Sequence, residues 1–153
     1  MRRIVPVLAA ALLTLIVVTG TVLAANTKFS VNLKGENEPG GTGDLDATGQ
    51  AHLELFPDTD MVCYTIKWTK VDGTVSGGHI HVGQPGVNGD IVLTLFGGPL
   101  GTPSEFPGDH FTASACVTGE SAVIDAILAD PTNYYVNIHT GPDFHGVIRG
   151  QLK

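Results

Sequence analysis

The chain has 153 residues and a formal net charge of −7 at pH 7, with 15 acidic and 8 basic residues. This length supports one domain with a sizeable hydrophobic core. Beyond the N-terminus the basic residues are scattered, at Lys28, Lys34, Lys67, Lys70, Arg149 and Lys153. The sequence holds no basic cluster that could neutralise phosphates, so we expect no nucleic-acid partner.

The first 25 residues are organised like a secretory signal peptide. Arg2 and Arg3 precede a run of apolar and small residues, 4–25, whose small-residue end suits a signal peptidase. We expect cleavage, with the mature chain beginning near Ala25 or Asn26. The alternative is an uncleaved N-terminal anchor, because the run is just long enough to span a bilayer. Either way, residues 26–153 would form one domain outside the cytoplasmic membrane, and a membrane partner is expected only for the uncleaved form.

Taken in chain order, the remaining segments predict short strands separated by turn residues. Apolar residues recur with period two in segments 28–33, 50–56, 61–68, 90–96, 111–117, 134–139 and 146–152. One segment has helical spacing instead: Thr118 is expected to cap a helix of about three turns that ends at Asp130-Pro131. This pattern predicts an all-β, antiparallel sandwich or barrel with one short helix.

The two cysteines fall on the less apolar faces of their predicted strands. Cys63 lies in segment 61–68 and Cys116 in segment 111–117, and in both the apolar side chains share the opposite face. In an exported protein, two cysteines most simply form one disulfide across the sheet surface. The alternative is two unpaired thiols.

Three histidines form the sharpest candidate site. His79 and His81 have i, i+2 spacing and therefore share one face of a strand. The Asn88-Gly89 pair after them predicts a type I′ hairpin turn. His139 ends a later strand, and if the two strands are adjacent the three imidazoles converge as in copper or zinc sites. Such binding would weaken as the pH falls through about 6. The alternative is a structural role, in which the imidazoles bond to loop backbone.

The remaining polar candidates favour structural interpretations. His52, His110 and His145 are scattered, so we expect them to be solvated. The acidic loop 36–46 lacks the regular ligand spacing of a calcium loop, so we expect it to be solvated too. Arg149 stands among apolar and glycine neighbours, and we expect it to pair with a structural carboxylate.

Four groups of residues together carry a family resemblance, which extends from Phe29 to Leu152. They are Leu33-x-Gly35-x-Asn37-Glu38-Pro39, His79-Ile80-His81-Val82-Gly83 with Gly86-x-Asn88-Gly89, Tyr135-Val136-Asn137-Ile138-His139-Thr140, and Ile148-Arg149-Gly150-Gln151-Leu152. These residues resemble the chordin-type (CHRD) domain family. The resemblance implies a Greek-key sandwich or barrel related to immunoglobulin-like or Cu/Zn-superoxide-dismutase-like folds, and it implies no mechanism.

The functional expectation is a binding protein rather than an enzyme. The sequence has no Gly-x-Ser-x-Gly motif, no Cys/His nucleophile arrangement and no phosphate-cradling loop. We expect an exported, non-catalytic binding or structural module for an unknown extracellular or cell-surface ligand, with no certain cofactor. The alternative is an extracytoplasmic copper- or zinc-binding protein that uses His79, His81 and His139. Superoxide dismutation would also need a fourth copper ligand and a carboxylate-containing zinc site, and the sequence shows no zinc-loop pattern.

Overall fold

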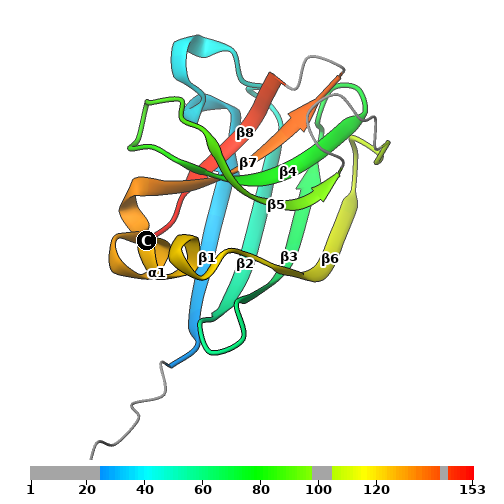
Figure 1. Cartoon of the computed structure of the whole chain (residues 1–153). Coiled ribbons are helices and arrows are strands. Elements are labelled where there is room, and N and C mark those ends of the chain that lie inside the picture. The colour runs from blue at the N-terminus through cyan, green and yellow to red at the C-terminus, as the bar shows by residue number, and fades with distance from the viewer. Residues whose placement is uncertain (1–24, 98–104, 142–144) are drawn as a thin grey trace, which may run out of the picture.

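The computed structural model describes residues 25–97, 105–141 and 145–153 (Figure 1). The described residues form eight antiparallel strands and one α-helix, which confirms the all-β prediction. The strands are β1 (Thr27–Lys34), β2 (Thr48–Phe56), β3 (Met61–Thr69), β4 (Val75–Val82), β5 (Ile91–Gly97), β6 (Phe111–Thr118), β7 (Tyr134–Thr140) and β8 (His145–Gln151). The helix is α1 (Ser121–Ala129), and short 3-10 turns are η1 (Gly35–Asn37), η2 (Pro39–Gly41) and η3 (Pro131–Asn133).

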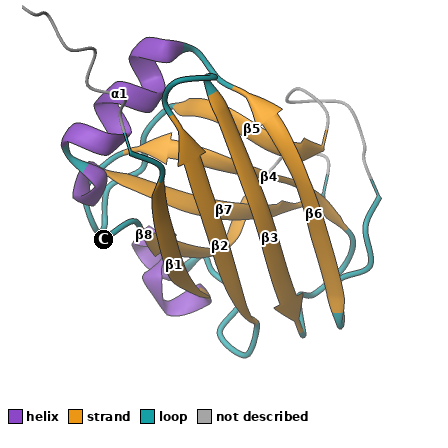
Figure 2. Cartoon of the chain, turned by 90° about the horizontal axis from the view of Figure 1, so that it is seen from below, coloured by secondary structure: helices purple, strands orange, loops and turns teal. Residues whose placement is uncertain are grey.

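The strands form one curled sheet in the order β5-β4-β7-β8-β1-β2-β3-β6. Figure 2 shows two layers, β1-β2-β3-β6 in front and β5-β4-β7-β8 crossing behind them. The edge strands β5 and β6 approach each other, so the sheet is a nearly closed barrel. Sequence-distant strands β4 and β7 are neighbours in this order, and this pairing brings the histidine-bearing segments together.

The space between the layers is an apolar core. Side chains of the front layer alternate between buried and solvent-facing positions along β1, β2 and β3, as period-two patterning requires. The back layer contributes Ile80, Val136, Ile138 and Ile148, each fully buried. An aromatic group joins the layers, because Trp68 on β3 stacks on Phe96 of β5 with ring centroids 5.5 Å apart.

Helix α1 begins two residues later than the sequence suggests, because its N-cap is Glu120 rather than Thr118. Thr118 is the last residue of β6 and pairs with Met61, so it belongs to the sheet rather than capping the helix. The N-cap is Glu120, which makes no side-chain capping hydrogen bond. The helix is held by its apolar face instead: Ile124 and Ile127 are fully buried.

The turn between β4 and β5 also differs from the prediction. Neither Asn88 nor Gly89 has the positive φ of a type I′ turn. The chain reverses earlier, where Pro85 precedes Gly86 (φ 79°) and the Val87 N–H donates to the Gln84 carbonyl at 3.0 Å. Proline followed by a glycine of positive φ is the signature of a type II turn. The Asn88-Gly89 pair is thereby left for other contacts, described below.

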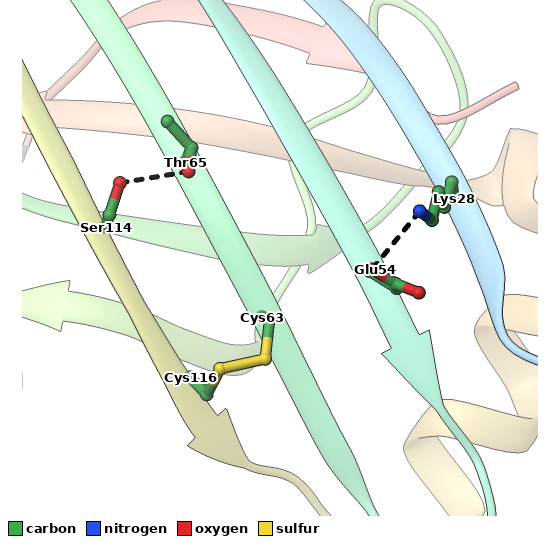
Figure 3. The surroundings of a disulfide bond; sticks show 6 residues. All are labelled: Lys28, Glu54, Cys63, Thr65, Ser114 and Cys116. Atoms are coloured by element: carbon green, nitrogen blue, oxygen red, sulfur yellow. Dashed lines mark hydrogen bonds and ion pairs between the residues drawn. A yellow bond between two sulfur atoms is a disulfide. The ribbon is translucent and has the colours of Figure 1, made fainter.

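The predicted disulfide between Cys63 and Cys116 is present (Figure 3). The two cysteines are register partners on β3 and β6, on the outward face of the front layer. Neighbouring polar pairs share this face, including Ser114 with Thr65 and Lys28 with Glu54. The prediction succeeded because period two placed both cysteines opposite the apolar side chains.

The predicted signal peptide or anchor falls almost wholly on residues 1–24, which lie outside the described residues. Among the residues that the structure describes, no helix is long and apolar enough to cross a membrane.

Candidate functional site: a buried histidine cluster

Strands β4 and β7 are buried on both faces, unlike the strands of the front layer. Their inner face packs into the apolar core. Their outer face, together with that of β8, carries polar side chains that are nevertheless buried. Together with Glu38, which lies between η1 and η2, we call this set the buried polar layer: it comprises Glu38, His79, His81, Asn137, His139 and Arg149, each at most 6% exposed.

The three predicted histidines converge in this layer. In the β4–β7 register, His81 lies opposite Tyr135, His79 opposite Asn137 and Gly77 opposite His139. All three imidazoles therefore stand on one face of two adjacent strands. One ring nitrogen from each histidine lies within 4.8 Å of those of the other two. The nitrogens Nε2 of His81 and Nε2 of His139 are only 3.1 Å apart.

The protonation of His81 follows from its hydrogen bond to the chain. Its Nδ1 lies 2.9 Å from the Gly89 carbonyl oxygen, which can only accept, so Nδ1 carries the hydrogen. In a neutral imidazole the other nitrogen, Nε2, then has a free lone pair, and it accepts a hydrogen bond from Nε2 of His139. A backbone carbonyl on one nitrogen and an available lone pair on the other is the arrangement of a metal-binding histidine.

His79 is fully buried, and neither of its ring nitrogens has a hydrogen-bond partner. Leaving a buried polar group unpaired costs about 1–3 kcal/mol, so such groups call for an explanation. Burial, reinforced by the neighbouring charge on His81, lowers the pKa of His79 to about 4. Burial also lowers the pKa of His81. Both imidazoles are therefore neutral at pH 7, which is the form that binds metals.

The loop of residues 83–90 covers the His81 end of the layer. Gly89 accepts the His81 hydrogen bond through its carbonyl and donates its N–H to the Tyr135 hydroxyl at 3.2 Å. A side chain at Gly89 would collide with the Val82 carbonyl, which explains the glycine at this position. Asn88-Gly89, predicted to turn the hairpin, thus supplies the backbone that orients a histidine.

Glu38 and Asn137 are the members of the layer that sequence reasoning missed. Glu38 belongs to the acidic loop predicted to be solvated, but burial raises its pKa to about 7, against the opposing effects of Arg149 and an Asn137 hydrogen bond. Oxygens Glu38 Oε1 and Asn137 Oδ1 are both buried without a hydrogen-bond partner. The charge pattern of the loop gave no sign that Glu38 is buried. The only sequence signal was its place in the Leu33-x-Gly35-x-Asn37-Glu38-Pro39 group.

Among the residues that the structure describes, Arg149 makes no ion pair with a carboxylate of the kind the sequence predicts. Its Nη1 donates to the Val87 carbonyl at 3.0 Å, and Glu38 acts on it only through longer-range attraction. Two other histidines lie apart from the cluster: His52 is exposed, and His110 is exposed beside Asp109. The side chain of His145 lies outside the described residues.

The cluster has the ligand atoms and the spacing to hold one metal ion. Two nitrogens bound to one zinc at about 2.0 Å in tetrahedral geometry lie about 3.3 Å apart. The observed 3.1 Å between His81 Nε2 and His139 Nε2 is already close to this value. Within the described residues, the three histidines are the one group of three or more candidate ligands, and they would leave one coordination position for water or another ligand.

Comparisons with known proteins identify the family. Neither the curated proteins nor the solved structures include a match to this chain. The family model described as the CHRD domain matches residues 29–152, which covers every strand from β2 to β8 and nearly all of β1. The match includes all three histidines of the cluster and both cysteines. The chain therefore belongs to the CHRD domain family.

Proposed function

We propose that this CHRD domain is an exported, non-catalytic module that binds one transition metal ion, copper or zinc, through His79, His81 and His139. The observation that carries the proposal is the convergence of three buried imidazole nitrogens within 4.8 Å. Chance clustering of three buried histidines on one sheet face would leave the unpaired His79 nitrogens without compensation. An ion bound to one of these nitrogens would offset the free-energy cost of burying it without a hydrogen bond.

The chemistry of the ligands agrees with this choice of metals. Imidazole nitrogens suit copper and zinc, whereas calcium and magnesium require oxygen ligands. The 4.8 Å limit on the nitrogen separations exceeds the roughly 3.3 Å of a tetrahedral zinc site, so binding would draw the rings together by about 1 Å or more. Rotation of side chains supplies movements of this size without changing the strands.

Non-catalytic binding is favoured over redox catalysis. A dismutase-like centre would need a second, carboxylate-containing site beside the first. In the described ranges, no second group of three or more candidate ligands occurs. The burial of the cluster also restricts access for a substrate, since His79, His81 and His139 are at most 6% exposed.

Two features support export. Arg2 and Arg3 followed by the apolar run match a signal peptide, and the disulfide between Cys63 and Cys116 is typical of oxidising compartments. Intact-mass measurement of protein recovered outside the cytoplasm tests this part. We expect a chain that begins near Ala25 or Asn26, and a mass that still includes residues 1–23 would establish the anchor instead.

Metal titration tests the central proposal. Metal-stripped wild-type protein is titrated with zinc and with copper against a chromophoric chelator, beside the variants His81→Ala and His52→Ala. We expect one ion per chain, an affinity loss of about 100-fold or more in His81→Ala and wild-type affinity in His52→Ala, whose histidine is exposed. Circular dichroism confirms that each variant is folded. Absence of binding in the wild type, or unchanged binding in folded His81→Ala, would return the histidines to a structural role.

A further inference from the structure

Arg149 is buried to 1% exposure although no carboxylate lies within ion-pairing distance of it among the described residues. Its guanidinium carbon lies 3.4 Å from the centroid of the Tyr135 ring, a close cation–π contact. Tyr135 in turn stacks on His81, with ring centroids 4.9 Å apart and planes 8° from parallel. The Arg149 guanidinium, the Tyr135 ring and the His81 imidazole are thus stacked on one another, and the stack ends at the histidine cluster.

A second route connects Arg149 with the same histidine through the 83–90 loop. Its Nη1 donates to the Val87 carbonyl at 3.0 Å and its Nη2 to the Gln84 carbonyl at 3.4 Å. These bonds hold the loop whose Gly89 carbonyl accepts the His81 Nδ1–H. The stack fixes the plane of the imidazole, and the loop fixes which of its nitrogens carries the hydrogen.

We propose that Arg149 is a positioning residue for the metal site, which aims Nε2 of His81 at the ion through Tyr135 and the 83–90 loop. This inference rests on the proposed metal binding. Partners behind a metal ligand orient it, and their removal typically costs about 10- to 100-fold in metal affinity. Arg149 is suited to this role because a planar guanidinium stacks on a ring and donates several hydrogen bonds from one rigid fork.

Substitution by lysine separates these properties from charge. Arg149→Lys keeps the positive charge but loses the planar stack and the fork. A cavity of about 460 Å³, lined in part by Arg149, Glu38 and Gln151, gives water access to the shorter side chain. The matched control is Gln151→Ala, two residues along the same strand. Gln151 also bonds to backbone, at Gly83 and Thr132, and it is the register partner of Tyr135, but its side chain takes no part in the ring stack or in the Arg149 bonds to the Val87 and Gln84 carbonyls.

The experiment measures zinc affinity, together with the visible absorption spectrum of a cobalt(II) ion bound in place of zinc, because this spectrum reports coordination geometry. For Arg149→Lys we expect an affinity loss of about 10- to 100-fold and a changed cobalt spectrum. For Gln151→Ala we expect wild-type affinity within about threefold and an unchanged spectrum. A loss of stability alone would lower the apparent affinity without changing the spectrum of the ion that still binds.

Folded Arg149→Lys with wild-type affinity and spectrum would overturn the positioning role and leave metal binding intact. Equal losses in Arg149→Lys and Gln151→Ala would overturn it too. If Arg149→Lys does not fold, Tyr135→Leu decides, because it removes the ring through which Arg149 stacks on His81. A several-fold affinity loss with a changed spectrum supports the proposal, and wild-type behaviour overturns it. If the wild-type protein binds no metal, the proposed function itself is wrong.

Discussion

The two layers of the barrel use the same kind of strand for different purposes. In the front layer, β2, β3 and β6 bury one face and leave the other to solvent, where the disulfide lies. In the back layer, β4 and β7 are buried on both faces. Their second face is closed by loops rather than by apolar packing, and it holds polar side chains in place of a second hydrophobic core.

We expect this difference to separate the residues that determine stability from those that bind the proposed metal ion. A buried polar side chain costs free energy unless it is paired, and three members of the buried polar layer carry unpaired atoms: Glu38, His79 and Asn137. The front layer has no such concentration of orphaned groups on its outer face, since its polar side chains are solvated there. We therefore expect substitutions in the shared core and the front layer to change unfolding, and substitutions in the buried polar layer to change binding.

The largest effect is expected where the layers meet. Trp68 is 2% exposed, stacks on Phe96 and donates its indole N–H to the Pro107 carbonyl at 2.8 Å. Trp68→Ala should lower the free energy of unfolding by about 3–5 kcal/mol, because it leaves a cavity between the layers. Urea denaturation should show one transition, since both layers share this core. Two separate transitions would show that the layers unfold independently.

Removal of the disulfide should have the next largest effect. The bridge spans a sequence separation of 53 residues, and its loss in Cys63→Ala/Cys116→Ala should cost about 2–4 kcal/mol of stability. Metal affinity should be unchanged, because the bridge lies on the solvent face of the front layer. Thermal unfolding and zinc titration of the double variant test both statements. A large loss of metal affinity in the folded variant would contradict the separation of the two layers.

Glu38 should make stability depend on pH in a direction unusual for a carboxyl group. Its folded pKa is raised from 4.5 to about 7, so its stabilising contribution is present below about pH 4.5 and is lost as the pH rises through 7. Glu38→Gln cannot ionise. The wild type should therefore lose on the order of 2 kcal/mol of unfolding free energy between pH 5 and pH 8 that the Glu38→Gln variant keeps.

Chemical denaturation of both proteins at each pH measures this difference. The opposite contribution from His79, whose lowered pKa makes stability rise with pH below about 6.5, is present in both proteins and cancels. Parallel pH profiles would show that Glu38 is not buried as the structure places it.

Metal binding should persist to lower pH than the sequence alone suggests. Protons compete for the ligand nitrogens only near the folded pKa values, and burial lowers those of His79, to about 4, and His81. Zinc affinity should therefore begin to fall at a lower pH than the unperturbed imidazole pKa of about 6.5 predicts, and protons should compete for His79 only near pH 4. Competition titrations corrected for the chelator's own protonation measure this. A midpoint near 6.5 would indicate solvated imidazoles.

The smallest effect is expected on the outer face of the front layer. The Ser114 hydroxyl donates to Thr65 Oγ1 at 2.9 Å in an exposed position. Thr65→Ala should change the free energy of unfolding by less than about 0.5 kcal/mol, because water replaces the lost partner. The same chemical denaturation series provides the value. A cost above about 1 kcal/mol would mean that this face is less solvated than its exposure indicates.

The sequence by itself determined the strands, the short helix and the faces on which the key residues lie. Period-two patterning placed Cys63 and Cys116 opposite the apolar side chains, and it placed His79 with His81 on one face. These results depend only on local geometry, because successive side chains of a strand alternate whatever the strand packs against. The family resemblance depended on residues spread over the chain and was confirmed by the match over residues 29–152.

Only the tertiary structure decided what the second face of β4 and β7 contacts. Alternation cannot tell a polar face that meets water from one that is closed by loops, so the burial of Glu38 was missed. The partners of Arg149 were missed for the same reason: Tyr135 lies 14 positions before it and Val87 lies 62 before it. Asn88-Gly89 was misjudged because Pro85-Gly86 had already turned the chain, which left Gly89 to bind His81. Contacts between residues distant in sequence depend on strand order, and strand order is a property of the whole sheet.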